Sequence, residues 1–172
     1  DNCPTVSNTD QVDIDADGAG DVCDLFPLDD ALLLEQNGTA KNENFASGIA
    51  MSDMNNDGVI DVLVGAPMAN VSVDGKTLKK AGVIRILSGK DNSILRTLNG
   101  ATADQQFGTA IAVVDDQDSD GVPDVVVGEP LADIITTVPK TSKLKNAGRV
   151  AMYSGTNGAL LNVIAEGGKA ND

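Results

Sequence analysis

Residues 107–130 read FGTAIAVVDDQDSDGVPDVVVGEP, and residues 45–67 read FASGIAMSDMNNDGVIDVLVGAP. Each stretch holds an apolar run, an acidic loop and a second apolar run, and each ends at a proline. Short β-branched runs bounded by Gly, Pro, Asn and Asp are typical of β-strands, and neither stretch has a sustained helical period. Both stretches therefore predict two strands joined by an acidic loop.

The two stretches belong to a longer internal repeat. Phe45 and Gly65 recur as Phe107 and Gly128, 62 and 63 residues later, and the segment that begins at Ala81 recurs 66 residues later. Repeats of this length indicate a stack of similar units. Each repeat predicts four strands: Phe45–Ser52, Val62–Ala66, Gly82–Leu87 and Ile94–Leu98 in the first, and Phe107–Val114, Val125–Gly128, Arg149–Tyr153 and Leu160–Ile164 in the second.

The predicted fold is all-β, with two four-stranded units in tandem, the first repeat (residues 45–106) and the second repeat (residues 107–172). Residues 31–44 align with the last strand of a unit and form a linker or a strand of a preceding unit, although ALLLE at 31–35 also suits a short helix. We expect the sequence to be part of a longer chain, because the next phenylalanine of the repeat would fall just beyond its last residue. Two such units cannot close a ring, so their open edges and faces need cover.

Three acidic loops, at residues 13–24, 53–61 and 116–124, place an oxygen-bearing side chain at every second position before a glycine. Calcium takes six to eight oxygen ligands, so side chains at loop positions one, three and five must converge while the chain turns sharply at position six. The loops predict about three calcium ions. The predicted side-chain ligands are Asp13, Asp15, Asp17, Asp21 and Asp24; Asp53, Asn55, Asp57 and Asp61; and Asp116, Asp118, Asp120 and Asp124, with backbone carbonyls from Ala19, Val59 and Val122.

The first loop differs from the other two. It runs to an acidic residue at position twelve, as in an EF-hand, whereas the loops at 53–61 and 116–124 end at position nine and lead into apolar strands. The alternative is that Asp, Asn and Gly simply form turns, but three loops with the same spacing favour metal binding. Magnesium fits less well, because it keeps its waters and rarely uses sites made of protein ligands alone.

Composition narrows the class of protein. The chain has 26 acidic and 12 basic residues, no histidine and a net charge of −14, which argues against nucleic acid and anionic membranes as partners. No apolar run is long enough to span a membrane, and the first residues resemble neither a start methionine nor a signal peptide. Lysines gather in two polar insertions, around residues 76–80 and 140–145, which we expect to be solvated loops.

Cys3 and Cys23 flank the first acidic loop. A bond between them would close a loop that has almost no apolar side chains to pack, and would contribute on the order of 3 kcal/mol. Alternatively, each pairs with a cysteine of an upstream repeat. Either pairing implies an oxidising, calcium-rich and therefore extracellular location.

The residues resemble two known families. FGTAIA at 107–112, the acidic loop and VVVGEP at 125–130 are similar to the FG-GAP repeat of integrin-alpha-type β-propellers, and the first repeat departs only by an alanine after its phenylalanine. That resemblance implies propeller blades with calcium in the loop between the first two strands. DNCP at 1–4 and the loop at 13–24 resemble a thrombospondin type 3 repeat, which implies a calcium-binding segment with little regular structure over residues 1–30.

These observations favour an extracellular structural or adhesion protein, secreted or at the cell surface. Calcium would make its repeats rigid so that they present a surface to another protein, a glycan or further copies of the chain. Exposed faces of the units, or the leading strand 31–38, could complete a neighbouring subunit and build a filament or a surface layer.

Other functions have less support in the sequence. A catalytic site needs an acid outside the three loops, such as Glu129 or Asp104, because the other acids serve as ligands and no nucleophile setting is recognisable. We therefore predict that the chain is not an enzyme, and the alternative is a non-catalytic accessory part of a secreted carbohydrate-active or other hydrolytic enzyme. A calcium sensor is disfavoured, because loops that enter rigid strands lack the paired helices that open in sensors.

Overall fold

The computed structural model describes residues 2–7, 9–13, 20–23, 36–136 and 142–168. The chain divides into two compact parts, which we call the N-terminal part (Asp1–Gln36) and the sheet part (Asn37–Asp172). Every regular element in the described ranges is a β-strand, which confirms the predicted all-β class. Over those same ranges, no helix combines the length and the hydropathy needed to cross a bilayer.

The N-terminal part is closed by a disulfide between Cys3 and Cys23. Next to it, the Gly20 N–H donates a hydrogen bond to the Asn2 carbonyl at 2.8 Å. Of the two pairings that the sequence left open, the structure therefore has the one within this segment. The predicted strand or helix at 31–35 lies outside the described residues.

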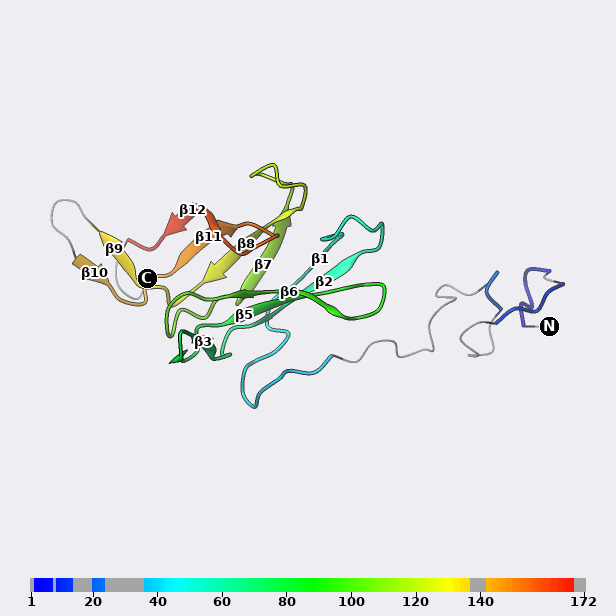
Figure 1. Cartoon of the computed structure of the whole chain (residues 1–172), viewed down its shortest axis with the longest axis horizontal. Coiled ribbons are helices and arrows are strands. Elements are labelled where there is room, and N and C mark those ends of the chain that lie inside the picture. Colours follow the sequence, from blue (N-terminus) through cyan, green and yellow to red (C-terminus); the bar gives the residue numbers. More distant parts are fainter. Residues whose placement is uncertain (1, 8, 14–19, 24–35, 137–141, 169–172) are drawn as a thin grey trace. The chain divides into compact units, whose positions relative to one another are not determined.

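Each repeat forms one four-stranded antiparallel sheet (Figure 1). The first sheet has the order β1-β2-β5-β6, and the second has the order β12-β11-β8-β7. All eight predicted strands are therefore present. Their bounds are β1 (Ile49–Ser52), β2 (Asp61–Ala66), β5 (Val83–Leu87) and β6 (Ile94–Asn99) in the first sheet, and β7 (Ala110–Val114), β8 (Asp124–Glu129), β11 (Arg149–Tyr153) and β12 (Leu160–Glu166) in the second.

The first strand of each repeat begins later than predicted. The chain has a left-handed conformation just after each phenylalanine, with φ of 67° at Ala46 and 86° at Gly108. Such a conformation does not continue a regular ladder. Phe45 and Phe107 therefore precede their strands.

The two lysine-bearing insertions form hairpins rather than the predicted loops, although their described lysines are exposed, as expected. One pairs β3 (Val71–Val73) with β4 (Lys76–Leu78), and the other pairs β9 (Ile134–Thr136) with β10 (Ser142–Leu144). In the first hairpin, Asp74 and Gly75 both have positive φ, as a tight two-residue hairpin turn requires. The hairpins also pack inward, because Val71 and Ile134 are buried in small apolar clusters.

The main core lies between the two sheets. Phe107 is 1% exposed at its centre and meets the Tyr153 ring edge-on, with centroids 5.1 Å apart. The two sheets are closely joined at one edge, where β7 lies against β1 and β2 (Figure 1). The other buried members of this core are Met54, Leu63, Ile84, Ile86 and Leu98 from the first repeat, and Val125, Val127 and Ala151 from the second.

Candidate metal centre

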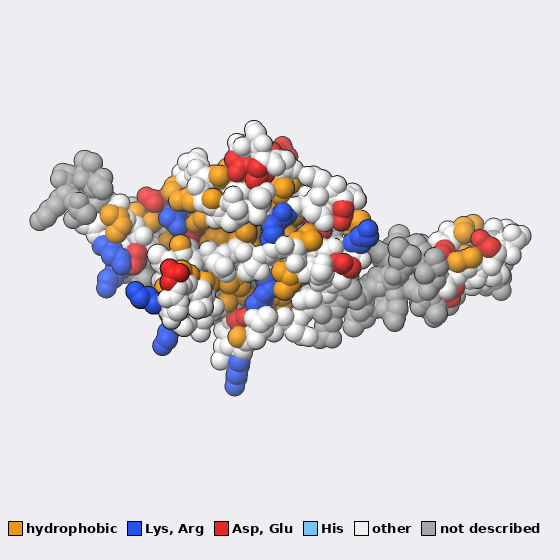
Figure 2. Space-filling view, in the orientation of Figure 1, with side chains coloured by type: hydrophobic (Ala, Val, Ile, Leu, Met, Phe, Trp, Pro, Cys, Tyr) orange, Lys and Arg blue, Asp and Glu red, His pale blue; other side chains and the backbone are white. Residues whose placement is uncertain are grey.

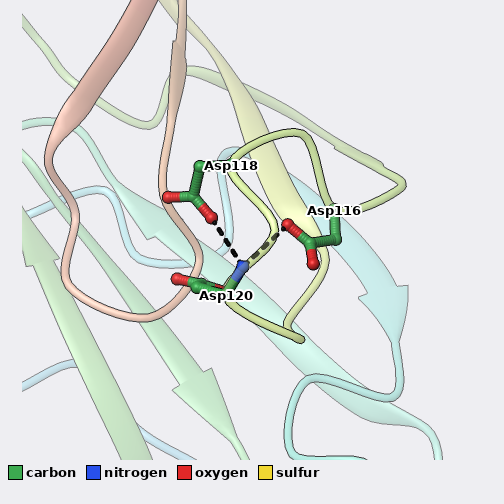
Figure 3. A group of neighbouring side chains, drawn as sticks. All are labelled: Asp116, Asp118 and Asp120. Carbon is green, nitrogen blue, oxygen red and sulfur yellow. Dashed lines mark hydrogen bonds between the residues drawn. The ribbon is translucent and has the colours of Figure 1, made fainter.

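The loop between β7 and β8 brings three carboxylates together. One oxygen from each of Asp116, Asp118 and Asp120 lies within 4.8 Å of the other two (Figure 3). The cluster is open to solvent, and acidic side chains gather at the top of Figure 2, where Figure 1 places this loop. The loop thus holds its first, third and fifth side chains close enough to share one cation.

Backbone hydrogen bonds hold this loop in its wrapped form. The Asp116 carboxylate accepts from the N–H groups of Ser119 at 2.7 Å and Gly121 at 2.8 Å. Ser119 and Gly121 have φ of 64° and 89°, so the chain turns to the left at positions four and six. The Asp120 N–H points at both Asp116 and Asp118 (Figure 3), at 3.3 and 3.2 Å. The three acids therefore surround backbone donors while their remaining lone pairs stay available.

The loop between β1 and β2 has the same construction. The Asp53 carboxylate accepts from Gly58 N–H at 2.9 Å, and Asn56 and Gly58 have φ of 59° and 86°. Asn55 stands at position three, where the second repeat has an acid, and its amide group donates to Asp57 at 2.9 Å. This loop therefore offers three oxygen-bearing side chains at the same positions, with one negative charge fewer.

The last acid of each loop is buried at the start of a strand. Asp61 opens β2 and Asp124 opens β8, and both are 0% exposed. Asp61 accepts from the N–H groups of Met54 at 2.8 Å and Gly89 at 3.0 Å. These bonds tie the beginning of the loop and the β5–β6 turn to one carboxylate.

Asp124 makes the equivalent bonds in the second repeat, from Gln117 N–H at 2.7 Å and Gly155 N–H at 3.2 Å. Each carboxylate oxygen has a second lone pair, so these bonds leave room for a metal. The assignment of both buried acids as ligands stays a prediction.

The two loops touch each other. The Asn56 side-chain amide donates to the Gly121 carbonyl at 2.7 Å, although the residues are 65 positions apart. A third segment also reaches the second loop, because the Ser154 hydroxyl lies 3.2 Å from an Asp120 oxygen. The spacing of the repeat predicted two separate loops, but only the packing of the sheets places them side by side.

In the second loop, the charged form of Asp118 is disfavoured. Desolvation, followed by repulsion from Asp120 and the other loop acids, raises the pKa of Asp118. In contrast, backbone hydrogen bonding, led by Gly58, lowers the pKa of Asp53. The third acid, Asp120, also has a lowered pKa, chiefly because of its interaction with Thr156. A bound cation would relieve the repulsion that falls mainly on Asp118.

The structure describes only part of the remaining predicted ligands. Asp15, Asp17, Ala19 and Asp24 of the first loop lie outside the described residues, and Asp13 and Asp21 flank that gap. Val59 and Val122 directly follow the two loop glycines, and their roles as carbonyl ligands stay predictions.

A buried polar cluster around Glu129, in the second sheet, was not predicted from the sequence. Glu129, proposed above only as a possible catalytic acid, is fully buried and accepts from Arg149 at 2.7 Å and Gln105 at 2.9 Å. The Tyr153 hydroxyl also donates to it, and burial together with this carboxylate raises the pKa of Tyr153. Through Gln105, these contacts attach the segment just before Phe107 to the second sheet.

The first repeat holds a related pair. Glu43 lies two residues before Phe45, as Gln105 does before Phe107, and its carboxylate is 3.1 Å from Arg85. Burial opposes its charge, but hydrogen bonds from Arg85 and Thr39 keep the pKa of Glu43 below its ordinary value. The signal available in the sequence was this recurrence of Glu or Gln before each phenylalanine.

Comparison with known proteins agrees with the fold of the sheet part. Residues 107–153 match the family model of the FG-GAP repeat. The chain is 34% identical over 91 residues to integrin alpha-8 of Gallus gallus, and these residues are 51% of this chain and 9% of that protein. It is 33% identical over 130 residues to integrin alpha-3 of Mus musculus, covering 72% of this chain and 10% of that protein.

A third relative is integrin alpha-6 of Homo sapiens, which is 32% identical over 91 residues, or 53% of this chain and 8% of that protein. The chain therefore spans only about a tenth of the length of these curated relatives. It contains an FG-GAP repeat similar to those of integrin alpha chains, and its four-stranded antiparallel sheets are consistent with propeller blades. The thrombospondin type 3 resemblance of residues 1–30 stays a prediction.

Proposed function

We propose that this chain is a calcium-stabilised module of an extracellular adhesion protein. The observation that carries the proposal is the convergence of Asp116, Asp118 and Asp120 in a loop that its own backbone bonds hold in shape. Hard oxygen donors at this spacing suit calcium, whose coordination tolerates irregular geometry better than that of magnesium. Asp53, Asn55 and Asp57 would hold a second ion in the first repeat.

Two further observations support the extracellular and adhesive parts of the proposal. The disulfide between Cys3 and Cys23 is typical of proteins that fold in an oxidising compartment. The similarity to integrin alpha chains extends over 130 residues, which is longer than one repeat. On this proposal the acidic segment at 13–24 binds a further ion in the manner of a thrombospondin type 3 repeat, and the partner is another extracellular protein, a glycan or a further copy.

Calcium would stabilise the fold rather than switch it between two conformations. Each loop leads directly into a strand of the core, so the ion would hold the ends of two strands together and cancel the repulsion among the loop acids. Binding only to the folded state would contribute about 2.7 kcal/mol when free calcium is a hundred times the Kd.

The substitution Asp118→Asn tests this proposal, because we expect it to have opposite effects with and without calcium. In chelator, the variant should melt at a higher temperature than the wild type, because it loses the charge that its neighbours repel. In millimolar calcium, the melting temperature of the variant should rise less than that of the wild type, because the variant lacks one charged ligand. The measurement is the melting temperature by circular dichroism in both conditions.

Asp104→Asn is the matched control, because Asp104 is an exposed acid outside the loops and asparagine tolerates its φ of 61°. Asp104→Asn also removes one negative charge, but from outside the loops. Calcium should therefore raise its melting temperature by as much as it raises that of the wild type. A wild-type melting temperature that is the same in calcium and in chelator would contradict the proposal.

A further inference from the structure

A hydrogen bond joins the β1–β2 loop (residues 53–61) to the β7–β8 loop (residues 116–124). The side-chain amide of Asn56 in the former donates to the Gly121 carbonyl of the latter at 2.7 Å. Both residues are exposed, so water competes for the donor and for the acceptor. Such a bond adds stability only when the segments that carry its two partners are already ordered. Its strength therefore depends on how well each loop is held in shape.

Both partners of this bond stand between predicted metal ligands. Asn56 is position four of its loop and Gly121 is position six of the other, so predicted ligands flank each of them on both sides. Neither residue is itself a predicted ligand. A shift in the backbone of either one would move the ligands beside it. The bond thus connects the two sets of ligands without belonging to either set.

Packing holds the bases of the two loops together beneath this bond. β1 lies against β7, and Met54, the second residue of the β1–β2 loop, is 0% exposed in the main core. A Cβ atom added to Gly155 would lie 2.9 Å from the Met54 methyl group. The Gly155 N–H in turn donates to Asp124, the last acid of the β7–β8 loop. The bases are therefore fixed by the core, and the exposed tips are the parts that an ion would order.

The two loops should bind calcium with different strengths. The β7–β8 loop has four acids and the β1–β2 loop has three, because Asn55 stands where the former has Asp118. Calcium affinity depends on the number of charged ligands. The β7–β8 loop should therefore fill first, and its ion would fix the Gly121 carbonyl in place.

We propose that the two loops bind calcium cooperatively, because the bond from Asn56 to Gly121 passes the order imposed by one ion to the other loop. With Gly121 fixed, Asn56 is held, and the ligands beside Asn56 lose less conformational freedom when their own ion binds. A filled β7–β8 loop should tighten binding at the β1–β2 loop about fivefold, and by linkage the reverse effect is equal. This inference rests on the proposed function and adds a form of regulation to it.

Charge alone would give the opposite sign. One calcium ion changes the formal charge of the β7–β8 loop from −4 to −2, which weakens the field that attracts a second cation to the β1–β2 loop. Salt screens this effect, because the Debye length is about 8 Å at physiological ionic strength. The hydrogen bond is a direct contact and is screened far less. Cooperativity should therefore persist when the salt concentration is raised.

The test is a calcium titration of the full chain, followed by NMR of the backbone amides. The N–H groups of Gly58 and Gly121 donate to the first acid of their own loops, Asp53 at 2.9 Å and Asp116 at 2.8 Å, so each signal reports on one loop. Asp118→Ala leaves the β7–β8 loop with one ligand fewer than the β1–β2 loop, so the β7–β8 loop should stay empty while the other fills. The calcium midpoint of the Gly58 signal should then rise about fivefold.

Asn56→Gly removes the bond without straining the chain, because glycine accepts the φ of 59° at this position. In this background, Asp118→Ala should leave the Gly58 midpoint unchanged or lower it slightly, since only the effect of charge remains. Comparing Asp118→Ala in the two backgrounds cancels any direct effect of the new glycine on its own loop.

Ser119→Gly is the matched control. Ser119 is position four of the β7–β8 loop, as Asn56 is of the β1–β2 loop, and its φ of 64° also suits glycine. Its bond to Asp116 comes from the backbone N–H, which glycine keeps. In the Ser119→Gly background, Asp118→Ala should still raise the Gly58 midpoint about fivefold.

Three results would overturn the inference: a Gly58 midpoint that Asp118→Ala does not raise in the wild-type background, a rise that survives Asn56→Gly, or a rise that disappears at high salt. Failure of the proposed function gives a different result, because neither glycine signal would then respond to calcium, and the inference would fail with it. If both signals respond to calcium but independently of each other, the inference alone fails.

Discussion

Gly65→Ala should destabilise the sheet part by about 3 kcal/mol or more, which would lower its melting temperature by roughly 10 °C. The added Cβ would lie 2.0 Å from the Gly108 carbonyl oxygen and 3.0 Å from its carbonyl carbon. These are backbone atoms in the middle of the contact between the sheets, so no side-chain rotation can make room. The sheets would have to separate, which would loosen the packing around Phe107.

Gly128→Ala is the matched control, because it makes the same change at the equivalent position of the second repeat. There the nearest atom to the new Cβ is the Ala110 Cβ at 3.2 Å, which a small shift can accommodate. We expect a change in unfolding free energy within about 1 kcal/mol. Equal losses in the two variants, measured by urea denaturation of the monomer at low concentration, would contradict the packing described here.

Phe107→Ala should cost about 4 kcal/mol of unfolding free energy. Phe107 is the largest fully buried side chain of the core, and it contacts both sheets as well as the edge of Tyr153. Its removal would leave a cavity at the contact between the repeats. Because this residue joins the two sheets, we also expect the loop contact between Asn56 and Gly121 to weaken.

Phe45→Ala provides the comparison for this prediction. Phe45 begins the first repeat as Phe107 begins the second, but it is only half-buried, with the Arg85 guanidinium 5.3 Å from its ring centroid. We expect a loss of about 2 kcal/mol, from less buried area and one cation–π contact. If the two substitutions lower the free energy of unfolding equally in denaturant titrations, then Phe107 contributes no more to the core than the half-buried Phe45 does.

The strands were predictable because each is a short local pattern. Apolar runs between turn-forming residues identified all eight strands of the two sheets, and the repeat fixed which strands correspond. The prediction failed where the conformation depends on one residue. Ala46 has a positive φ without being a glycine, so a run that began at Phe45 was read as continuous strand.

The first lysine-rich insertion could have been assigned correctly from the sequence. Asp74-Gly75 between two alternating segments is a strong local signal for a tight hairpin. The second hairpin has no such pair in its described residues. Its inward packing through Ile134 and Leu144 depends on the sheet beside it.

The sequence by itself determined the all-β class, the two repeats and the acidic loops, because strand propensity, repeat spacing and alternating oxygen ligands are properties of neighbouring residues. Only the tertiary structure decided which faces are covered. Gly65 and Gly128 occupy equivalent places in the repeat, yet one is pressed against the next sheet and the other lines an open pocket. Burial, the contact between the two loops and the pairing of Glu43 with Arg85 depend on residues distant in the chain, and local patterns do not encode those distances.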